Sequence, residues 1–183
     1  MPRWPYGEPV TTYVLLLRGV NVGGVTLKMA DVAAALTDAG FGAVRTVLAS
    51  GNILVDSDAD AAAVTAGAQQ RMRQRFDYPA WVLTYELTAL RAIIADYPFT
   101  PEVDGHHSYV TFVTDPAALD ELAGLTAGPD EKIARGDGVV YWQVPKNATL
   151  KSAIGATMGA ARFKPVTTTR NLRTLGKVVA RAG

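Results

Sequence analysis

The 183-residue sequence contains no cysteine and only two histidines, His106 and His107. The lack of cysteine excludes disulfide bonds, thiolate nucleophiles and cysteine-based zinc sites. Because adjacent side chains on a strand point to opposite faces of a sheet, the two histidines are not expected to share a metal ion. The sequence therefore predicts no metal site, and its residue types indicate no cofactor.

Long hydrophobic runs are also lacking. Apolar runs such as Val14–Leu17 and Val32–Leu36 fall far short of the roughly 18 residues that a membrane span requires. Residues 1–10 are rich in proline and carry no apolar signal-peptide core, so they are expected to form a flexible N-terminal lead-in. We expect a cytoplasmic protein without a membrane partner. Hydrophobic residues make up 49% of the chain, which is enough to bury a sizeable core.

Acidic residues are absent from the last part of the chain. All 17 Asp and Glu residues lie at or before Asp137, whereas the remainder carries only basic charges. The basic residues of this segment are Lys146, Lys151, Arg162, Lys164, Arg170, Arg173, Lys177 and Arg181. A segment with one sign of charge attracts anions at modest ionic strength. The alternative is that this segment docks on the acidic first part of the same chain, and the sequence leaves both interpretations open.

The first half of the chain alternates strand-like and helix-like patterns. The expected elements are a strand at Thr11–Leu17, a helix at Lys28–Ala39, strands at Ala43–Leu48 and Ile53–Asp56, a helix capped by Asp60 and reaching about Phe76, and a strand at Trp81–Tyr85. Gly40 stands where a left-handed helix C-cap is expected. The order β-α-β-β-α-β is typical of the ferredoxin-like, or split βαβ, fold.

A connecting helix at Thr88–Asp96 precedes a second run of the same pattern. The expected elements are a strand at Ser108–Thr114, a helix from Pro116 to about Leu125, hairpin strands at Lys132–Arg135 and Val139–Val144, a helix at Asn147–Met158, a strand or loop at Phe163–Val166, and a final helix capped by Thr168 or Thr169. The predicted fold class is α+β, with two ferredoxin-like subdomains, mainly antiparallel sheets and a C-terminal helix. The first subdomain is expected at 11–97 and the second at 98–183, together forming one compact unit.

Two loops rich in hydrogen-bond donors are expected to meet at one edge of the first sheet. The first strand ends at Leu17, and the third strand begins beside it because these strands are antiparallel neighbours in this fold. The polar side chains and glycines at this edge are Arg18, Gly19, Asn21, Gly23, Gly24, Lys28, Ser50, Gly51 and Asn52. Glycines allow a ligand to approach backbone N–H groups closely, so this edge is a candidate binding surface.

Several of these motifs resemble those of the DUF1697 family of uncharacterised bacterial proteins. The motifs are Leu16–Gly24, Lys28-Met29, Ser50-Gly51-Asn52 and Thr169-Arg170-Asn171 with Thr174. The resemblance spans about residues 11–182 and implies an α+β protein of two subdomains without an established activity. This chain has Ala49 where glutamine is common in the family and Leu172 where tryptophan is common, so ligand contacts through those family side chains are not expected here.

The motif Thr169-Arg170-Asn171 is predicted to form a third wall of the site, at a helix start. Threonine hydroxyls, backbone N–H groups and an arginine at a helix N-terminus favour an anion. Arg173, Thr174 and Lys177 would complete a composite site between the subdomains. The alternative is that the threonines only cap a helix and Arg170 is a surface charge.

The predicted function is binding of a phosphate-bearing ligand, nucleic acid being the broadest case. The alternative is an enzyme that acts on a small anionic metabolite, with arginine and backbone groups stabilising an oxyanion. No catalytic residue is assigned, because neither a base for Ser50 nor a carboxylate pair is identifiable in the motifs. Four aromatic residues of the second half either pack in its core or stack bases on an open sheet: Tyr109, Phe112, Tyr141 and Trp142.

Overall fold

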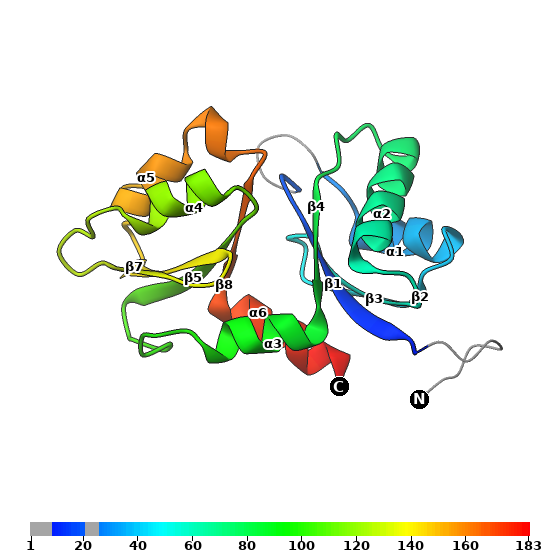
Figure 1. Cartoon of the computed structure of the whole chain (residues 1–183), viewed down its shortest axis with the longest axis horizontal. Coiled ribbons are helices and arrows are strands. Elements are labelled where there is room, and N and C mark those ends of the chain that lie inside the picture. The colour runs from blue at the N-terminus through cyan, green and yellow to red at the C-terminus, as the bar shows by residue number, and fades with distance from the viewer. Residues whose placement is uncertain (1–8, 21–25) are drawn as a thin grey trace. The chain divides into compact units, whose positions relative to one another are not determined.

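The computed structural model describes residues 9–20 and 26–183 (Figure 1). The chain divides into two compact units. The first unit contains the described residues up to Arg91 together with Lys177–Gly183, and the second contains Ala92–Gly176. No helix formed by the described residues is long and apolar enough to cross a lipid bilayer.

The first unit contains a four-stranded antiparallel sheet in the order β2-β3-β1-β4. Its elements are β1 (Thr11–Leu17), α1 (Met29–Asp38), β2 (Gly42–Val47), β3 (Asn52–Ser57), α2 (Ala61–Arg75) and β4 (Val82–Glu86), followed by α3 (Leu87–Ala95). Helices α1 and α2 lie on the same face of the sheet (Figure 1). Leu15 and Ile53 of the sheet pack with Val32 of α1 and Met72 of α2 in one buried core.

Local signals define the ends of these helices. The Asp60 side chain accepts a hydrogen bond from the backbone N–H of Ala63 at 2.8 Å, which caps α2. Gly40 has a φ of +95° and follows the C-cap of α1, as the sequence predicts. In the second unit, Asp115 caps α4, and Pro116 occupies its first turn.

The second unit repeats the topology of the first, with the strand order β6-β7-β5-β8. Its elements are β5 (His106–Val113), α4 (Pro116–Ala123), β6 (Lys132–Arg135), β7 (Val139–Pro145), α5 (Ala153–Met158), the 3-10 turn η1 (Ala161–Phe163) and β8 (Thr167–Asn171), followed by α6 (Leu172–Ala182). All neighbouring strands of this sheet are antiparallel. Both units are therefore ferredoxin-like, which confirms the predicted fold class.

Two helix starts differ from the prediction. Thr167–Asn171 forms strand β8, so the expectation that Thr168 or Thr169 caps a helix is wrong, and α6 begins only at Leu172. The reason is pairing with β5, in which Thr169 lies opposite Thr111 and their hydroxyl oxygens are 2.8 Å apart. Helix α5 begins at Ala153 instead of Asn147, because Ser152 caps it by accepting a hydrogen bond from the N–H of Gly155.

The four aromatic side chains of the second sheet are core residues. Phe112, Tyr141 and Trp142 are buried, and the half-buried Tyr109 ring stacks on Trp142 with centroids 4.4 Å apart. Trp142 packs with Phe163 and the residues of α4 and α5. Phe112, Tyr141 and Trp142 are therefore not available to stack bases on an open sheet, because each of these residues is at most 3% exposed.

The end of α3 and the segment after it cover the other face of the second sheet through side-chain hydrogen bonds. The Tyr141 hydroxyl donates to the carbonyl of Ile93 at 2.7 Å, and the Gln143 amide donates to the carbonyl of Thr100 at the same distance. The hydroxyl of Ser108 donates to the carbonyl of Pro101 at 2.8 Å. These bonds fix the 93–101 segment on the sheet, and this segment carries part of a pocket described below.

The free energy of unfolding should fall at alkaline pH, and replacement of Tyr141 by phenylalanine should make this fall smaller. Burial, helped by Asp96 and Asp137, raises the pKa of Tyr141 from its ordinary value of 10.0 to about 12. The unfolded chain therefore loses this proton first, and the free energy of unfolding falls as pH rises from about 10 to about 12. At neutral pH the free energy of unfolding of the variant should be about 0.5–1.5 kcal/mol lower than that of the wild type, because the hydrogen bond to the Ile93 carbonyl is lost.

The gap in stability between the wild type and Tyr141→Phe should narrow across that pH range. Urea unfolding at a series of pH values measures it. The free energy of unfolding of both proteins should still fall with pH because of Tyr85, since burial also raises the pKa of Tyr85 to about 12. A difference in stability that does not change with pH would contradict the raised pKa of Tyr141.

Candidate functional site

The first candidate site lies where β1 ends beside the start of β3. Leu16 lies opposite Asn52 in the sheet, and the N–H of Leu17 donates to the carbonyl of Gly51 at 2.8 Å. Gly51 has a φ of +80°, which fits the hairpin turn predicted between β2 and β3. The sequence prediction that Arg18 and the Ser50–Asn52 turn share one sheet edge is thereby confirmed.

Arg18 is held at this edge by its backbone and by two aromatic residues. Its N–H donates to the carbonyl of Trp81 at 3.1 Å, and its carbonyl accepts a hydrogen bond from the hydroxyl of Tyr78. The guanidinium carbon lies 5.4 Å from the centre of the half-exposed Trp81 ring, within range of a cation–π contact. Partial burial lowers the pKa of Arg18, and the Coulombic interaction with Tyr78 acts in the opposite direction. An arginine nevertheless stays charged at physiological pH.

Buried side chains anchor both ends of the glycine-rich loop. Val20 and Leu27 belong to the same core cluster as Leu17 and Val32. Asn21, Gly23 and Gly24 lie outside the described residues, so their predicted role stays a prediction. Val20 and Leu27 are thus held in the core on either side of those residues.

Helix α1 begins beside an exposed lysine. Lys28 occupies the N-cap position, and its side chain makes no capping hydrogen bond to the described first turn. The first N–H groups of a helix have no partner within the helix itself, and this end carries the positive part of the helix dipole. Asp31 is the acidic residue of that turn and opposes an incoming anion.

The hairpin turn supplies one exposed hydroxyl and one buried amide. The Asn52 side chain is fully buried and donates to the carbonyl of Val47 at 2.9 Å and to the hydroxyl of Ser50 at 2.8 Å. Asn52 therefore stabilises the turn, whereas Ser50 is exposed. Gly19, with a φ of +68°, is also exposed, and no described heavy atom lies within 4 Å of the position that a Cβ would take.

The third motif belongs to the second unit and has a different local structure from the one expected. Arg170 lies in β8, is 7% exposed, and donates from its guanidinium to the hydroxyl of Thr168 at 2.8 Å and to the carbonyl of Thr169 at 2.9 Å. Asn171 accepts a hydrogen bond from the N–H of Arg173 at the start of α6. Thr174 is half-buried, and Lys177 is exposed and belongs to the first unit. The composite site that would join Arg170 to Arg18 stays a prediction.

Arg173 and Glu102 form an exposed ion pair that the sequence analysis did not identify. The Arg173 Nε lies 3.0 Å and 2.9 Å from the two carboxylate oxygens of Glu102, and an Nη2 contact completes the pair. The hydrogen bond to Arg173 lowers the pKa of Glu102, and the same bond raises that of Arg173. The two residues are 71 positions apart, so no local pattern in the sequence indicates their contact.

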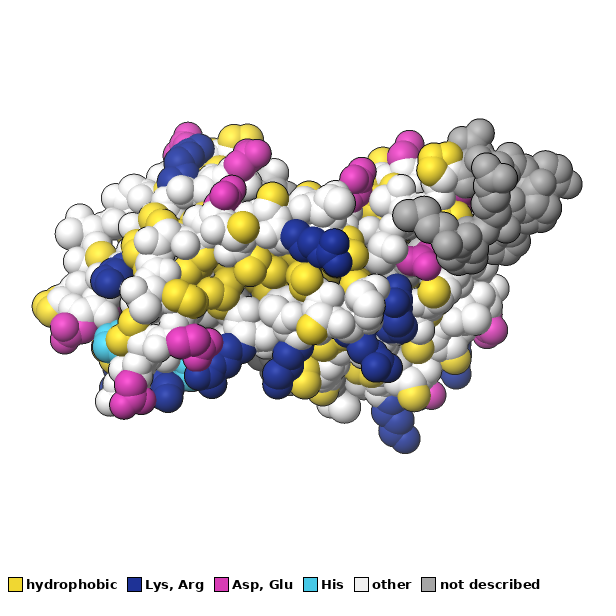
Figure 2. Space-filling view, turned by 90° about the horizontal axis from the view of Figure 1, so that it is seen from below, with side chains coloured by type: hydrophobic (Ala, Val, Ile, Leu, Met, Phe, Trp, Pro, Cys, Tyr) yellow, Lys and Arg dark blue, Asp and Glu magenta, His cyan; other side chains and the backbone are white. Residues whose placement is uncertain are grey.

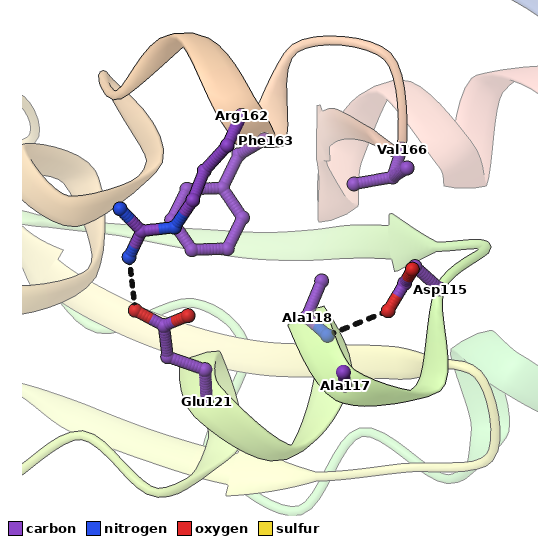
Figure 3. A pocket seen from close by; sticks show the side chains of 7 residues that line it. All are labelled: Asp115, Ala117, Ala118, Glu121, Arg162, Phe163 and Val166. Carbon is purple, nitrogen blue, oxygen red and sulfur yellow. Dashed lines mark hydrogen bonds and ion pairs between the residues drawn. The ribbon is translucent and has the colours of Figure 1, made fainter.

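Described residues of the second unit line two pockets of different size. The larger, of about 400 Å³, is lined by the end of α3, the 97–102 segment and the first turns of α6. The smaller, of about 240 Å³, lies beside α4 and contains an Arg162–Glu121 ion pair (Figure 3). The Arg162 guanidinium lies 4.6 Å from the Phe163 ring centre, and Asp115 adds a second carboxylate already engaged as the cap of α4. The smaller pocket thus contains structural contacts and an excess of negative charge.

Two arginines of the basic segment are paired with acidic residues of the second unit. Arg162 pairs with Glu121 and Arg173 pairs with Glu102, and both acidic residues precede the basic segment in the chain.

On the face shown in Figure 2, hydrophobic side chains form a patch beside several basic and a few acidic side chains. Within residues 9–20 and 26–183, no group of three or more His, Cys, Asp or Glu side chains has the geometry to hold a metal ion.

Two ferredoxin-like units with a donor-rich loop after the first strand define an α+β protein of two subdomains. Residues 10–141 match the family described as "Protein of unknown function (DUF1697)", and the chain belongs to that family. The third motif lies beyond the matched residues. The chain is also similar to the solved structure of the conserved bacterial protein SP0830 from Streptococcus pneumoniae, with a TM-score of 0.81 and 23% identity over 96% of this chain and 100% of that chain. No curated protein shows a significant match.

Proposed function

We propose that the first unit binds a phosphate-bearing anion at the end of β1. The observation that supports this most directly is the position of Arg18 and Lys28, which flank a loop whose two ends are anchored in the core by Val20 and Leu27. An arginine offers a planar set of donors that fits phosphate oxygens, and a lysine adds a second positive charge. The two charges would hold the phosphate from opposite ends of the loop.

Backbone and hydroxyl donors add to this arrangement. The start of α1 presents N–H groups and the positive end of a helix dipole, which together favour phosphate. The exposed Gly19 leaves its backbone open to a ligand, and Ser50 contributes a hydroxyl from the neighbouring turn. The ligand class therefore includes phosphate, nucleotides and the backbone of a nucleic acid.

The test is a titration of the full chain with pyrophosphate, a mononucleotide, and RNA and DNA oligomers at two salt concentrations. Binding should weaken as salt is added, and an oligomer should show a steeper dependence than pyrophosphate because it contacts more charges. Arg18→Ala should weaken binding about tenfold or more, because hydrogen bonds to charged groups contribute about 1.5–3 kcal/mol. The backbone hydrogen bonds of Arg18 do not depend on its side chain, so the fold should be retained.

Two matched variants make this test specific. Arg91→Ala removes an exposed arginine from α3 and should leave binding unchanged. Asp31→Asn removes the acidic side chain from the first turn of α1 and should strengthen binding about twofold to fivefold. Absence of binding by the wild type at low salt, or equal binding by Arg18→Ala, would refute the proposal.

A further inference from the structure

The larger pocket of the second unit has a mainly apolar lining. Ile94 at the end of α3, the rings of Tyr97 and Phe99, and Leu172 at the start of α6 contribute to it. The two rings meet edge to face with centroids 5.5 Å apart, and the Tyr97 hydroxyl donates to the carbonyl of Trp142 at 3.2 Å. Because the ring of Tyr97 is tied to the buried sheet, this wall is preformed.

Two small residues keep the pocket open. Ala95 of α3 and Gly176 of α6 line it without a long side chain. A Cβ added to Gly176 would have no described heavy atom within 4 Å. A glycine inside a helix lowers helix stability relative to alanine, so its presence here is not explained by local preference. Gly176 therefore lines the pocket without a side chain that would occupy it.

A positive and a negative group lie together at the same pocket. Glu102 and Arg173 both line it, and they are paired side by side through the contacts of the Arg173 Nε and Nη2 with the carboxylate. The N–H of Arg173 is held by the Asn171 side chain at 2.9 Å, which fixes the start of α6 that carries the guanidinium. A guanidinium has five N–H donors and a carboxylate has several acceptor positions, so each retains capacity for a ligand.

We propose that this pocket binds a free α-amino acid with a large apolar side chain. The ligand carboxylate pairs with Arg173, its ammonium pairs with Glu102, and its side chain occupies the apolar space beside Tyr97 and Gly176. The two opposite charges of the protein match the two opposite charges of the ligand. A ligand with a single charge would be attracted by one of the two protein groups and repelled by the other. A volume of about 400 Å³ accommodates a leucine or phenylalanine.

This site is separate from the anion site proposed for the first unit, since all its lining residues belong to the second unit. The smaller pocket beside α4 does not offer the same match. It has two carboxylates, Asp115 and Glu121, against one guanidinium, and it is only about 240 Å³ in volume. An amino acid carboxylate would be repelled there.

The test is calorimetric and NMR titration of the full chain with L-phenylalanine and L-leucine. Glycine tests the need for the side chain, N-acetylphenylalanine lacks the ammonium, and phenylalanine amide lacks the carboxylate. Each of the three should bind at least tenfold more weakly than phenylalanine. Equal binding of either blocked compound would overturn the zwitterion assignment and indicate recognition of a peptide end instead.

Variants at one position separate occupation of the pocket from stability. Gly176→Leu should fill the space and weaken phenylalanine binding at least tenfold, while Gly176→Ala should leave most of the binding and raise the thermal midpoint. Arg173→Gln should weaken the binding of phenylalanine but not the binding of phenylalanine amide. The proposal is overturned if no apolar amino acid binds at millimolar concentration, or if a folded Gly176→Leu protein binds as well as the wild type.

Discussion

Replacement of Trp142 by alanine is expected to lower the free energy of unfolding by about 3–5 kcal/mol. The indole is 1% exposed, packs with Val113, Ile154 and Phe163, and stacks on Tyr109. Its Nε1–H donates to the hydroxyl of Thr111 at 2.9 Å. Removal of the side chain leaves a cavity between the sheet and helices α4 and α5, and the surrounding core can collapse into it only in part.

Trp142→Phe is the matched control for this change. It keeps an aromatic ring in the core and loses the hydrogen bond to Thr111, so the expected loss is smaller, about 1–2 kcal/mol. Urea unfolding followed by far-ultraviolet circular dichroism measures both variants. A loss below about 1 kcal/mol for Trp142→Ala, accompanied by weaker oligonucleotide binding, would instead indicate an exposed stacking residue.

Replacement of Gly51 by alanine is expected to lower the free energy of unfolding by about 2–4 kcal/mol. Two effects add at this residue. Its φ of +80° is unfavourable for a side chain, and an added Cβ would lie 2.7 Å from the Cβ of the buried Leu17. β1 and the hairpin must therefore move apart. This movement weakens the hydrogen bond from the N–H of Leu17 to the carbonyl of Gly51.

Gly40→Ala separates the two effects. Gly40 has a φ of +95°, but no described heavy atom lies within 4 Å of its added Cβ, so only the backbone strain of about 1–2 kcal/mol is expected. Thermal and urea unfolding of both variants give the comparison. Equal losses would show that the contact with Leu17 is relieved without cost. Gly51→Ala should also weaken anion binding in the folded protein, because the displaced edge carries Arg18.

The sequence predicts the order of the elements well because their signals are local. The cap at Asp60, the proline in the first turn of α4, the glycine after α1 and the apolar periodicity each depend on residues within a few positions of one another. The same holds for the meeting of Arg18 with the Ser50–Asn52 turn. Once the β-α-β-β-α-β order is established, the antiparallel pairing of β1 with β3 follows from the topology.

The interpretation of Thr167–Asn171 shows where local signals are insufficient. A run of threonines suits both a helix cap and a strand, and only pairing with β5 selects the strand. The aromatic residues of the second sheet have the same ambiguity. Alternation places them on both faces of the sheet. Packing of the 93–101 segment on one face and of α4 and α5 on the other buries Phe112, Tyr141 and Trp142.

The sequence alone determined the two ferredoxin-like units and the donor-rich edge of the first, because strand periodicity, caps and turn residues act over short distances. Only the tertiary structure decided that Asn52 is buried in its own turn and that Arg170 donates within β8. It also brought Glu102 to Arg173 beside an apolar pocket, across 71 positions of chain. The physical reason is that burial and long-range charge pairing depend on which surfaces pack together, and no pattern of neighbouring residues encodes those contacts.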